Sequence, residues 1–119
     1  MNTKEKGNQG EDIAVAYLEK NEYKIIERNW MYRKMEIDIL CEKNDEIVIV
    51  EVKCRFGDNN ETFYDSITKI KQRFLVEAAN QYVLKNNINK SVRFDVVFVS
   101  FIKGRSIVEH IEDAFQPIL

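Results

Sequence analysis

The 119-residue sequence predicts a single α/β domain over residues 1–119, with a mixed central sheet flanked by two helices. Apolar residues recur with helical spacing over 7–21 and again over 66–86. Between these helices, residues 36–55 form two Ile- and Val-rich arms joined by Asn and Asp, as in a β-hairpin. Residues 92–101 are almost continuously apolar, which indicates a central strand covered on both faces. Because this strand follows the hairpin through a helix, we expect it to run parallel to its neighbour.

The composition limits the classes of function. The net charge of -2 excludes a uniformly basic nucleic-acid binder, so affinity for nucleic acid must come from a local patch or through a metal. The polar start and the lack of a long apolar run predict a cytoplasmic protein without a membrane span. The chain has two cysteines, Cys41 and Cys54, and one histidine, His110. A zinc site is therefore not expected, and both cysteines are interpreted as buried free thiols.

The first predicted helix carries an acid on its apolar stripe. Glu11 lies three residues before Ala14 and seven before Leu18, on the face expected to pack inward. An acid is unusual on such a face. Two interpretations stay open: Glu11 is a first-turn acid favoured by the helix dipole, or it points at the same site as Asp38 and Glu51.

A predicted strand over 23–30 leads through residues 31–34 into the hairpin. This stretch interleaves cations with aromatic rings: Arg28, Trp30, Tyr32, Arg33 and Lys34. Such a segment can contact a phosphate backbone and stack on bases. It is equally consistent with an edge strand whose long cationic side chains lie along apolar surface.

The hairpin turn at residues 44–45 fixes which residues face one another. In this register Asp38 lies opposite Glu51, and Glu36 lies opposite Lys53. Facing residues point to the same side of the sheet. One face then carries Glu36, Asp38, Leu40, Ile47, Ile49, Glu51 and Lys53, and the other carries Ile37, Ile39, Cys41, Val48, Val50, Val52 and Cys54.

The predicted pair of facing carboxylates suggests a metal site. Like charges opposed across strands are destabilising, and desolvation beside an apolar surface adds to the cost. A divalent cation between Asp38 and Glu51 would remove that cost, because Mg²⁺ takes carboxylate oxygens as ligands. Lys53, on the same face, would then orient or deprotonate an attacking water. The alternative is an exposed, solvated hairpin face with a weak Glu36–Lys53 surface pair.

The second half of the chain carries further candidates. Residues 56–65 are polar and rich in turn formers, and we expect a mobile loop that covers a substrate. The second helix is expected to begin at Ser66 or Thr68. Its early cations, Lys69, Lys71 and Arg73, do not complement the helix dipole, so they either bind a phosphate or form a solvated face. A last strand is predicted over 106–111, with His110 as a structural or solvated residue, and Asp95 is expected to pair with Arg93.

The order of helix, three strands, helix and strand resembles the αβββαβ core of the restriction-endonuclease-like fold. Glu11, Asp38 and the run Glu51-Val52-Lys53 resemble its Asp…(Asp/Glu)-x-Lys signature. A closer resemblance covers nearly the whole chain and points to the uncharacterised YraN-like family of small bacterial proteins. Its motifs are Gly7-x-x-Gly10-Glu11-x-x-Ala14, Asn29-Trp30, Glu36-Ile37-Asp38, Val50-Glu51-Val52-Lys53-x-Arg55, Lys71, Arg93-Phe94-Asp95 and Ala114-Phe115. One departure is Met35, where the family usually has Gly, and it places the geometry before Glu36 in question.

That family is similar to archaeal Holliday-junction resolvases, and the resemblance implies a bacterial cytoplasmic protein with a role on nucleic acid, but it supplies no reaction. Together with the facing carboxylates, it leads us to expect a divalent-metal-dependent nuclease acting on DNA, with branched DNA as one candidate substrate. The implied catalytic residues are Glu11, Asp38, Glu51 and Lys53, and the implied ligands of Mg²⁺ or Mn²⁺ are Asp38, Glu51, the Val52 carbonyl and Glu11. The expected nucleic-acid contacts are Arg55, Lys71, Arg33 and Lys34. The analogy also suggests a homodimer. The alternatives are a non-catalytic nucleic-acid-binding or adaptor module, and a protein that binds only protein partners.

Overall fold

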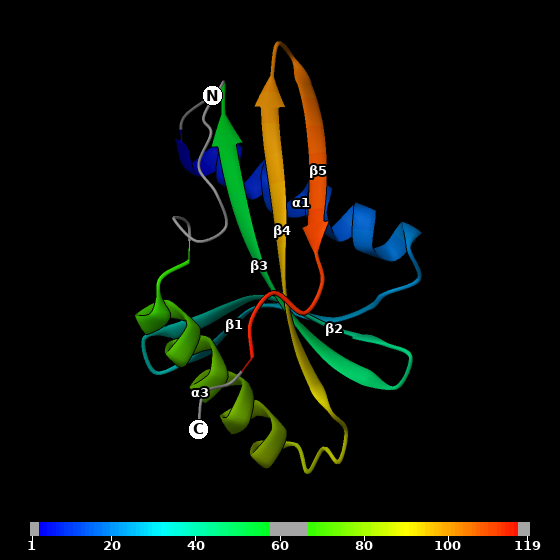
Figure 1. Ribbon diagram of the computed structural model, residues 1–119, viewed down its shortest axis with the longest axis vertical. Helices are drawn as coiled ribbons and strands as arrows, with labels where there is room; N and C mark the ends of the chain where they lie inside the picture. The colour runs from blue at the N-terminus through cyan, green and yellow to red at the C-terminus, as the bar shows by residue number, and fades with distance from the viewer. Residues whose placement is uncertain (1–2, 58–66, 117–119) are drawn as a thin grey trace.

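The computed structural model describes residues 3–57 and 67–116 of the chain. Most of the predicted loop over 56–65 and the candidate cap Ser66 lie outside these residues. The elements, shown in Figure 1, are α1 (Thr3–Lys20), β1 (Lys24–Tyr32), β2 (Met35–Lys43), β3 (Glu46–Phe56), α3 (Lys69–Lys85), β4 (Val92–Ile102) and β5 (Arg105–Ile111). The predicted order of a helix, three strands, a helix and a further strand is confirmed.

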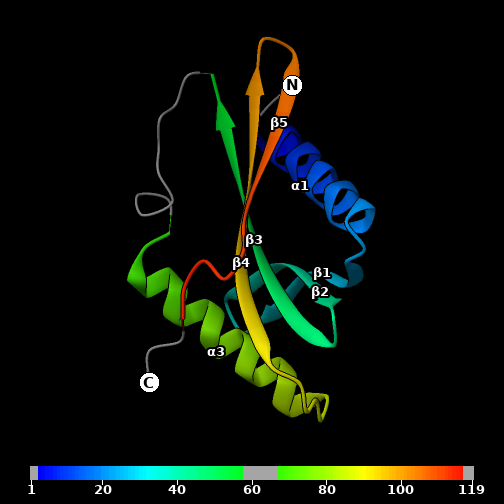
Figure 2. The same cartoon turned by 45° about the vertical axis from the view of Figure 1, so that its right-hand side comes forward.

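The strands form one mixed sheet in the order β1-β2-β3-β4-β5. All neighbouring strands are antiparallel except β3 and β4, which are parallel, as the crossover through α3 predicts. The two described helices cover opposite faces of the sheet (Figure 2). No helix in the described ranges is long and apolar enough to span a membrane.

Side chains of the two central strands alternate between the two helices. On β4, Phe94 packs in the cluster under α3, while Val97 and Val99 pack in the cluster under α1. This strand is buried over most of its length, which confirms the prediction of a central strand covered on both faces. Helix α3 begins after Thr68, whose side chain accepts a hydrogen bond from the Lys71 amide, so Thr68 is the cap.

The hairpin register is confirmed where β2 and β3 are paired. Asn44 and Asp45 adopt positive φ angles of 50° and 63°, and the described pairing runs from Lys43 opposite Glu46 to Ile39 opposite Val50. The prediction for Ile37 is wrong. We expected Ile37 on the face of Ile39, but it packs in the cluster beneath α3, where it is paired with Trp30 of β1.

Helix α1 begins at Thr3, four residues before the predicted start at 7. The sequence missed this turn because residues 3–6 carry no apolar periodicity. Further along, the backbone of α1 approaches β3 closely at Gly10, where an added Cβ would collide with the Sγ of Cys54. Glycine at this position therefore sets the distance between α1 and the strand that carries Glu51.

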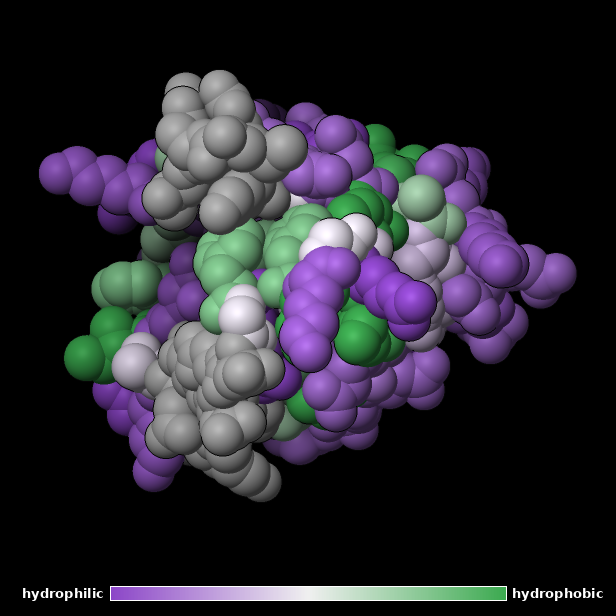
Figure 3. Space-filling model, turned by 90° about the horizontal axis from the view of Figure 1, so that it is seen from above, coloured by the Kyte–Doolittle hydropathy of each residue, from purple (hydrophilic) through white to green (hydrophobic). Residues whose placement is uncertain are grey.

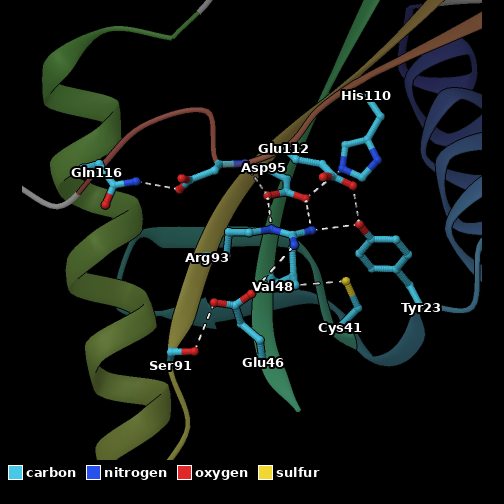
Figure 4. A network of polar contacts seen from close by, with 11 residues as sticks. Tyr23, Cys41, Glu46, Val48, Ser91, Arg93, Asp95, His110, Glu112 and Gln116 are labelled. Atoms are coloured by element: carbon cyan, nitrogen blue, oxygen red, sulfur yellow. Dashed lines mark hydrogen bonds and ion pairs between the residues drawn. The ribbon is translucent and has the colours of Figure 1, made fainter. Parts of the chain in front are cut away.

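A buried polar network ties the far strands to the start of β1 (Figure 4). Asp95 accepts two hydrogen bonds from Arg93, as predicted, and its Oδ2 lies 2.7 Å from His110 Nε2. Arg93 also donates to the Tyr23 hydroxyl at 2.7 Å, and the Asp113 amide donates to Asp95 at 3.0 Å. Burial alone would raise the pKa of Asp95, but these hydrogen bonds outweigh it and hold that pKa below its usual value. His110 is thus a structural residue, with a side chain only 5% exposed.

We predict that Gly10→Ala lowers the free energy of unfolding by about 1–3 kcal/mol, the usual cost of overpacking. Cys54→Ala removes the atom that the new methyl group would meet. The double variant Gly10→Ala/Cys54→Ala should therefore recover most of the loss, and urea unfolding of the four proteins measures the coupling. If Gly10→Ala lowers the free energy of unfolding equally in the wild type and in Cys54→Ala, the close contact between Gly10 and Cys54 does not explain the glycine.

Candidate functional site

Two strands of the hairpin separate at the candidate carboxylates. The described β2–β3 pairing ends at Ile39 and Val50, one residue before Asp38 and Glu51. Beyond this point β2 stays paired with β1, and β3 stays paired with β4. The Val52 amide, left without a strand carbonyl on this side, donates to Asp38 Oδ2 at 2.9 Å. The sheet therefore forks where β2 and β3 part. The hydrogen bond from Val52 places the Asp38 carboxylate in this fork.

Glu51 is one of only two buried charged residues found in residues 8–57 and 67–116, with 5% of its surface exposed. Its Oε1 lies 3.8 Å from Lys71 Nζ. Its Oε2 is buried and has no hydrogen-bond partner in the described part of the chain. Burial raises the pKa of Glu51, although the charges of Lys71 and Lys53 oppose that shift. A buried, partnerless carboxylate oxygen costs free energy unless a proton or a cation satisfies it.

The pKa of Asp38 is raised to about 8. Burial is the main cause and the charge of Glu51 is the next, with smaller contributions from Glu11 and Glu36, while the hydrogen bond from the Val52 amide opposes the shift. At neutral pH the carboxyl is therefore mostly protonated when no cation is nearby.

Glu11 lies beside this pair, but its oxygens are already engaged. Because α1 begins at Thr3, Glu11 is not a first-turn acid, which removes that interpretation. Its side chain is 13% exposed; Arg28 Nε donates to Oε1 at 3.1 Å, and Asn29 Nδ2 donates to Oε2 at 3.2 Å. The same Asn29 amide group donates to Glu36 at 3.1 Å. This role of Asn29 was not predicted from the sequence. The local signal for it is the residue type, because asparagine tolerates the left-handed φ of 52° found here.

The predicted cations lie at different distances from the fork. Lys53 and Lys71 both act on Glu51, Lys71 through the direct contact. Arg55 is 16% exposed, and its guanidinium lies 3.9 Å over the Phe98 ring, with Nη1 3.8 Å from Glu109. Its Nε is buried without a partner in the described ranges. Arg55 is therefore held against β4 and β5 rather than beside the carboxylates.

The remaining predictions concern the β1–β2 turn and the residues that follow it. Arg33 and Lys34 form this turn and are exposed. Met35 lies within β2 and packs partly buried against the cluster under α3, so no glycine-specific backbone is needed there. Glu36 is not in the described β2–β3 pairing, and the Glu36–Lys53 pair expected from the register is replaced by the contact with Asn29.

The donor set fits a divalent cation only in part. Asp38 and Glu51 supply two carboxylates, one with a partnerless buried oxygen, which is what a hard cation requires. Among residues 3–57 and 67–116, however, no group of three His, Cys, Asp or Glu side chains is arranged to hold a metal. The third carboxylate, Glu11, is engaged by Arg28 and Asn29. A bound cation would therefore be completed by a main-chain carbonyl, such as that of Val52, and by water.

Figure 3 looks onto the end of the molecule where β3 ends and β4 turns into β5, and shows an apolar area bordered by hydrophilic residues. In the described chain, this end carries the stacked Phe56 and Phe101 rings, whose centroids are 5.6 Å apart. A hollow of about 490 Å³ lies beside them and is also lined by Lys103 and Arg105. The carboxylates lie deeper along β3 than this hollow, so the two features are separate.

We predict that Asp38→Asn stabilises the cation-free protein at alkaline pH. A carboxyl whose folded pKa is raised from 3.8 to about 8 binds its proton more tightly when folded, so stability falls as pH rises through that window. The variant should unfold with a free energy higher by on the order of 6 kcal/mol at about pH 9, and the gain should vanish below about pH 4. Asp45→Asn, at an 84% exposed side chain, is the control and should show no such trend. A gain independent of pH would contradict the raised pKa.

The sequence matches known proteins over most of its length. The model of the uncharacterised protein family UPF0102 matches residues 10–99. The UPF0102 protein FP2501 of Flavobacterium psychrophilum is 40% identical over 109 residues, covering 92% of both chains. The UPF0102 protein BF0634 of Bacteroides fragilis is 42% identical, over 95% of this chain and 93% of that protein. The UPF0102 protein CD630_12710 of Clostridioides difficile is 40% identical, over 97% of this chain and all of that protein.

These matches span the whole carboxylate site, including Glu11, Asp38, Glu51 and Lys53. The names of the relatives state no reaction, substrate or partner. They therefore identify the family of this chain but not its chemistry. The protein belongs to the uncharacterised protein family UPF0102.

Proposed function

We propose that this protein is a divalent-metal-dependent nuclease that hydrolyses phosphodiester bonds in DNA. The observation that carries the proposal is the pair of buried carboxylates in the fork, one with a raised pKa and the other with a buried oxygen that lacks a partner. Two desolvated acids beside one another are costly to fold without a proton or a cation between them. Carboxyl groups with perturbed pKa values cluster at functional sites.

Asp38 and Glu51 are the side chains that would hold Mg²⁺ or Mn²⁺, and the cation would offset the charge that develops on phosphate during hydrolysis. The Val52 amide fixes the orientation of the Asp38 carboxylate, so the ligand is positioned before the cation arrives. Binding requires Asp38 to lose its proton, so the affinity for the cation should rise with pH up to about 8.

The cations beside the pair supply the contacts to the substrate. Lys53 is close enough to influence Glu51 electrostatically, and it orients the attacking water or takes its proton. Lys71 reaches Glu51 from the first turns of α3, and a bound phosphate would compete for it. Glu11, held by Arg28 and Asn29, keeps α1 and β1 in place around the fork and adds negative charge without a free oxygen.

A second candidate is a non-catalytic nucleic-acid-binding or adaptor module that retains the fold. The observation that favours it is the lack of a third side-chain ligand in the described ranges. This candidate predicts salt-dependent binding of DNA through exposed cations such as Arg33 and Lys34, and no effect of Asp38→Asn on that binding.

We predict saturable Mn²⁺ binding to the wild type, measured by calorimetry and electron paramagnetic resonance. Asp38→Asn and Glu51→Gln should each abolish it, because each removes one of two carboxylate ligands while keeping the side-chain shape. Below pH 8 the affinity should rise by up to about tenfold for each pH unit, since one proton leaves for each cation bound. Asp45→Asn is the matched control, an exposed acid on the same hairpin, and should bind as the wild type does.

Cleavage of duplex and branched DNA in Mn²⁺ is the companion assay. Loss of cleavage in Asp38→Asn, Glu51→Gln and Lys53→Met, with folding intact, is the result expected of the nuclease. Absence of Mn²⁺ binding in the folded wild type would contradict the proposed function. Mn²⁺-independent DNA binding without cleavage would favour the non-catalytic module.

A further inference from the structure

A groove lies between the edge strand β1 and the C-terminal half of α3, which lie beside one another in Figures 1 and 2. It has a volume of about 410 Å³. The described residues that line it are Trp30, Met31, Tyr32, Gln81, Leu84 and Lys85. Met31 and Leu84 are unusually exposed for apolar residues, at 52% and 69%. The carboxylate site uses none of these residues.

The aromatic side of the groove is pre-organised. The rings of Trp30 and Tyr32 are stacked within 8° of parallel, with centroids 6.4 Å apart. The buried Tyr82 of α3 packs edge-on against Trp30 and restricts the orientation of the Trp30 ring. The Arg33 guanidinium lies 5.3 Å over the Tyr32 ring and extends the stack toward the turn. Flat groups held in this way bind further flat groups at a low cost in conformational entropy.

The charge of the groove favours an anionic occupant. Lys85 lines it, Arg33 and Lys34 lie at the turn beside it, and none of its described lining residues is acidic. An extended peptide added to the edge of β1 is a poorer fit. The register of β1 shifts between Ile25 and Glu27, and Asn29 has a left-handed φ, so the edge is not a regular ladder of donors and acceptors.

The groove also lies close to the carboxylate pair. Trp30 is paired with Ile37, and the next residue along β2 is Asp38. A chain that leaves the groove across β2 therefore reaches the fork of the sheet within about one strand spacing, about 5 Å.

We propose that this groove binds an unpaired strand of nucleic acid, with bases stacked on the Trp30–Tyr32 pair and phosphates near Arg33, Lys34 and Lys85. The inference rests on the proposed nuclease function and gives it a substrate class, namely nucleic acid with an unpaired segment next to the cleaved bond. Cations interleaved with stacked aromatic rings bind single strands with little regard to sequence, because every base has a flat face.

Trp30 is the only tryptophan in the chain, so its fluorescence reports on the groove directly. We predict that a thymidine oligonucleotide about 12 residues long, within the usual range of site sizes, quenches this emission saturably at low salt in EDTA. The same oligonucleotide annealed to its complement should bind at least about tenfold more weakly through this groove, because its bases are already stacked. Anisotropy of a labelled oligonucleotide gives a second measure of affinity that does not depend on Trp30.

Leu84→Glu places a negative charge in the groove at a side chain exposed enough to leave the core intact. It should weaken binding of the oligonucleotide about tenfold or more. Ile107→Glu is the matched control, because Ile107 is a 55% exposed aliphatic residue on β5, at the opposite edge of the sheet, and its variant should bind as the wild type does. Circular dichroism of both variants checks the fold.

Three results would overturn the inference. The first is that the oligonucleotide does not quench Trp30 emission, and the second is that Leu84→Glu and Ile107→Glu lose the same amount of affinity for it. The third is that the emission depends on the protein concentration and not on the oligonucleotide concentration. The last result would assign the groove to a second copy of the chain. Because EDTA removes divalent cations, this test is independent of the carboxylates. If the protein binds Mn²⁺ but the oligonucleotide does not quench Trp30, only the proposal that the groove binds an unpaired strand is refuted. If the oligonucleotide quenches Trp30 but the protein does not bind Mn²⁺, only the proposed nuclease function is refuted.

Discussion

The desolvated contact between Asp38 and Glu51 is the interaction on which the candidate site depends. Two carboxylates share a fork in the sheet from which water is largely excluded, and one oxygen of Glu51 is left without a partner. The fold tolerates this because Asp38 keeps its proton, because Lys71 lies 3.8 Å from Glu51, and because the Val52 amide binds Asp38. These groups offset only part of the free-energy cost of burying the two carboxyl groups. A bound cation would offset the remainder, so the uncompensated part favours cation binding.

The surrounding structure keeps the fork open. Strand β2 follows β1 and strand β3 follows β4 beyond Ile39 and Val50, so no strand of residues 3–57 and 67–116 fills the gap between them. Helix α1 approaches β3 through Gly10, which brings Glu11 to the edge of the site. On the other side of the fork, buried hydrogen bonds of Asp95 tie β4 to β5 and to the turn after it. Apolar burial thus supplies the stability, while polar contacts fix the geometry.

The sequence predicted the hairpin and its register as far as Ile39 opposite Val50, because Asn44-Asp45 and the alternation of apolar residues are local signals. The register predicted for Asp38 and Glu51 is not found, because the described β2–β3 pairing ends before them. It could not predict where the two strands separate, since that depends on the partner each strand takes on its other side. The same limit explains the wrong face for Ile37, which pairs with Trp30 across a strand. The engagement of Glu11 by Arg28 and Asn29 joins a helix to a strand, and no spacing within the helix encodes it. Nor did the spacing reveal that His110 contacts Asp95 on the neighbouring strand.

The most direct test of this account is a pH titration of Asp38, monitored by nuclear magnetic resonance of its ¹³C-labelled side-chain carboxyl. In the cation-free protein we expect the Asp38 resonance to titrate with an apparent pKa of about 8, and the midpoint to move well below neutrality when Mg²⁺ is added. Asp38→Asn assigns the resonance by its absence. A midpoint near the usual carboxyl value of 3.8, unchanged by Mg²⁺, would show that the fork is solvated and would contradict the account.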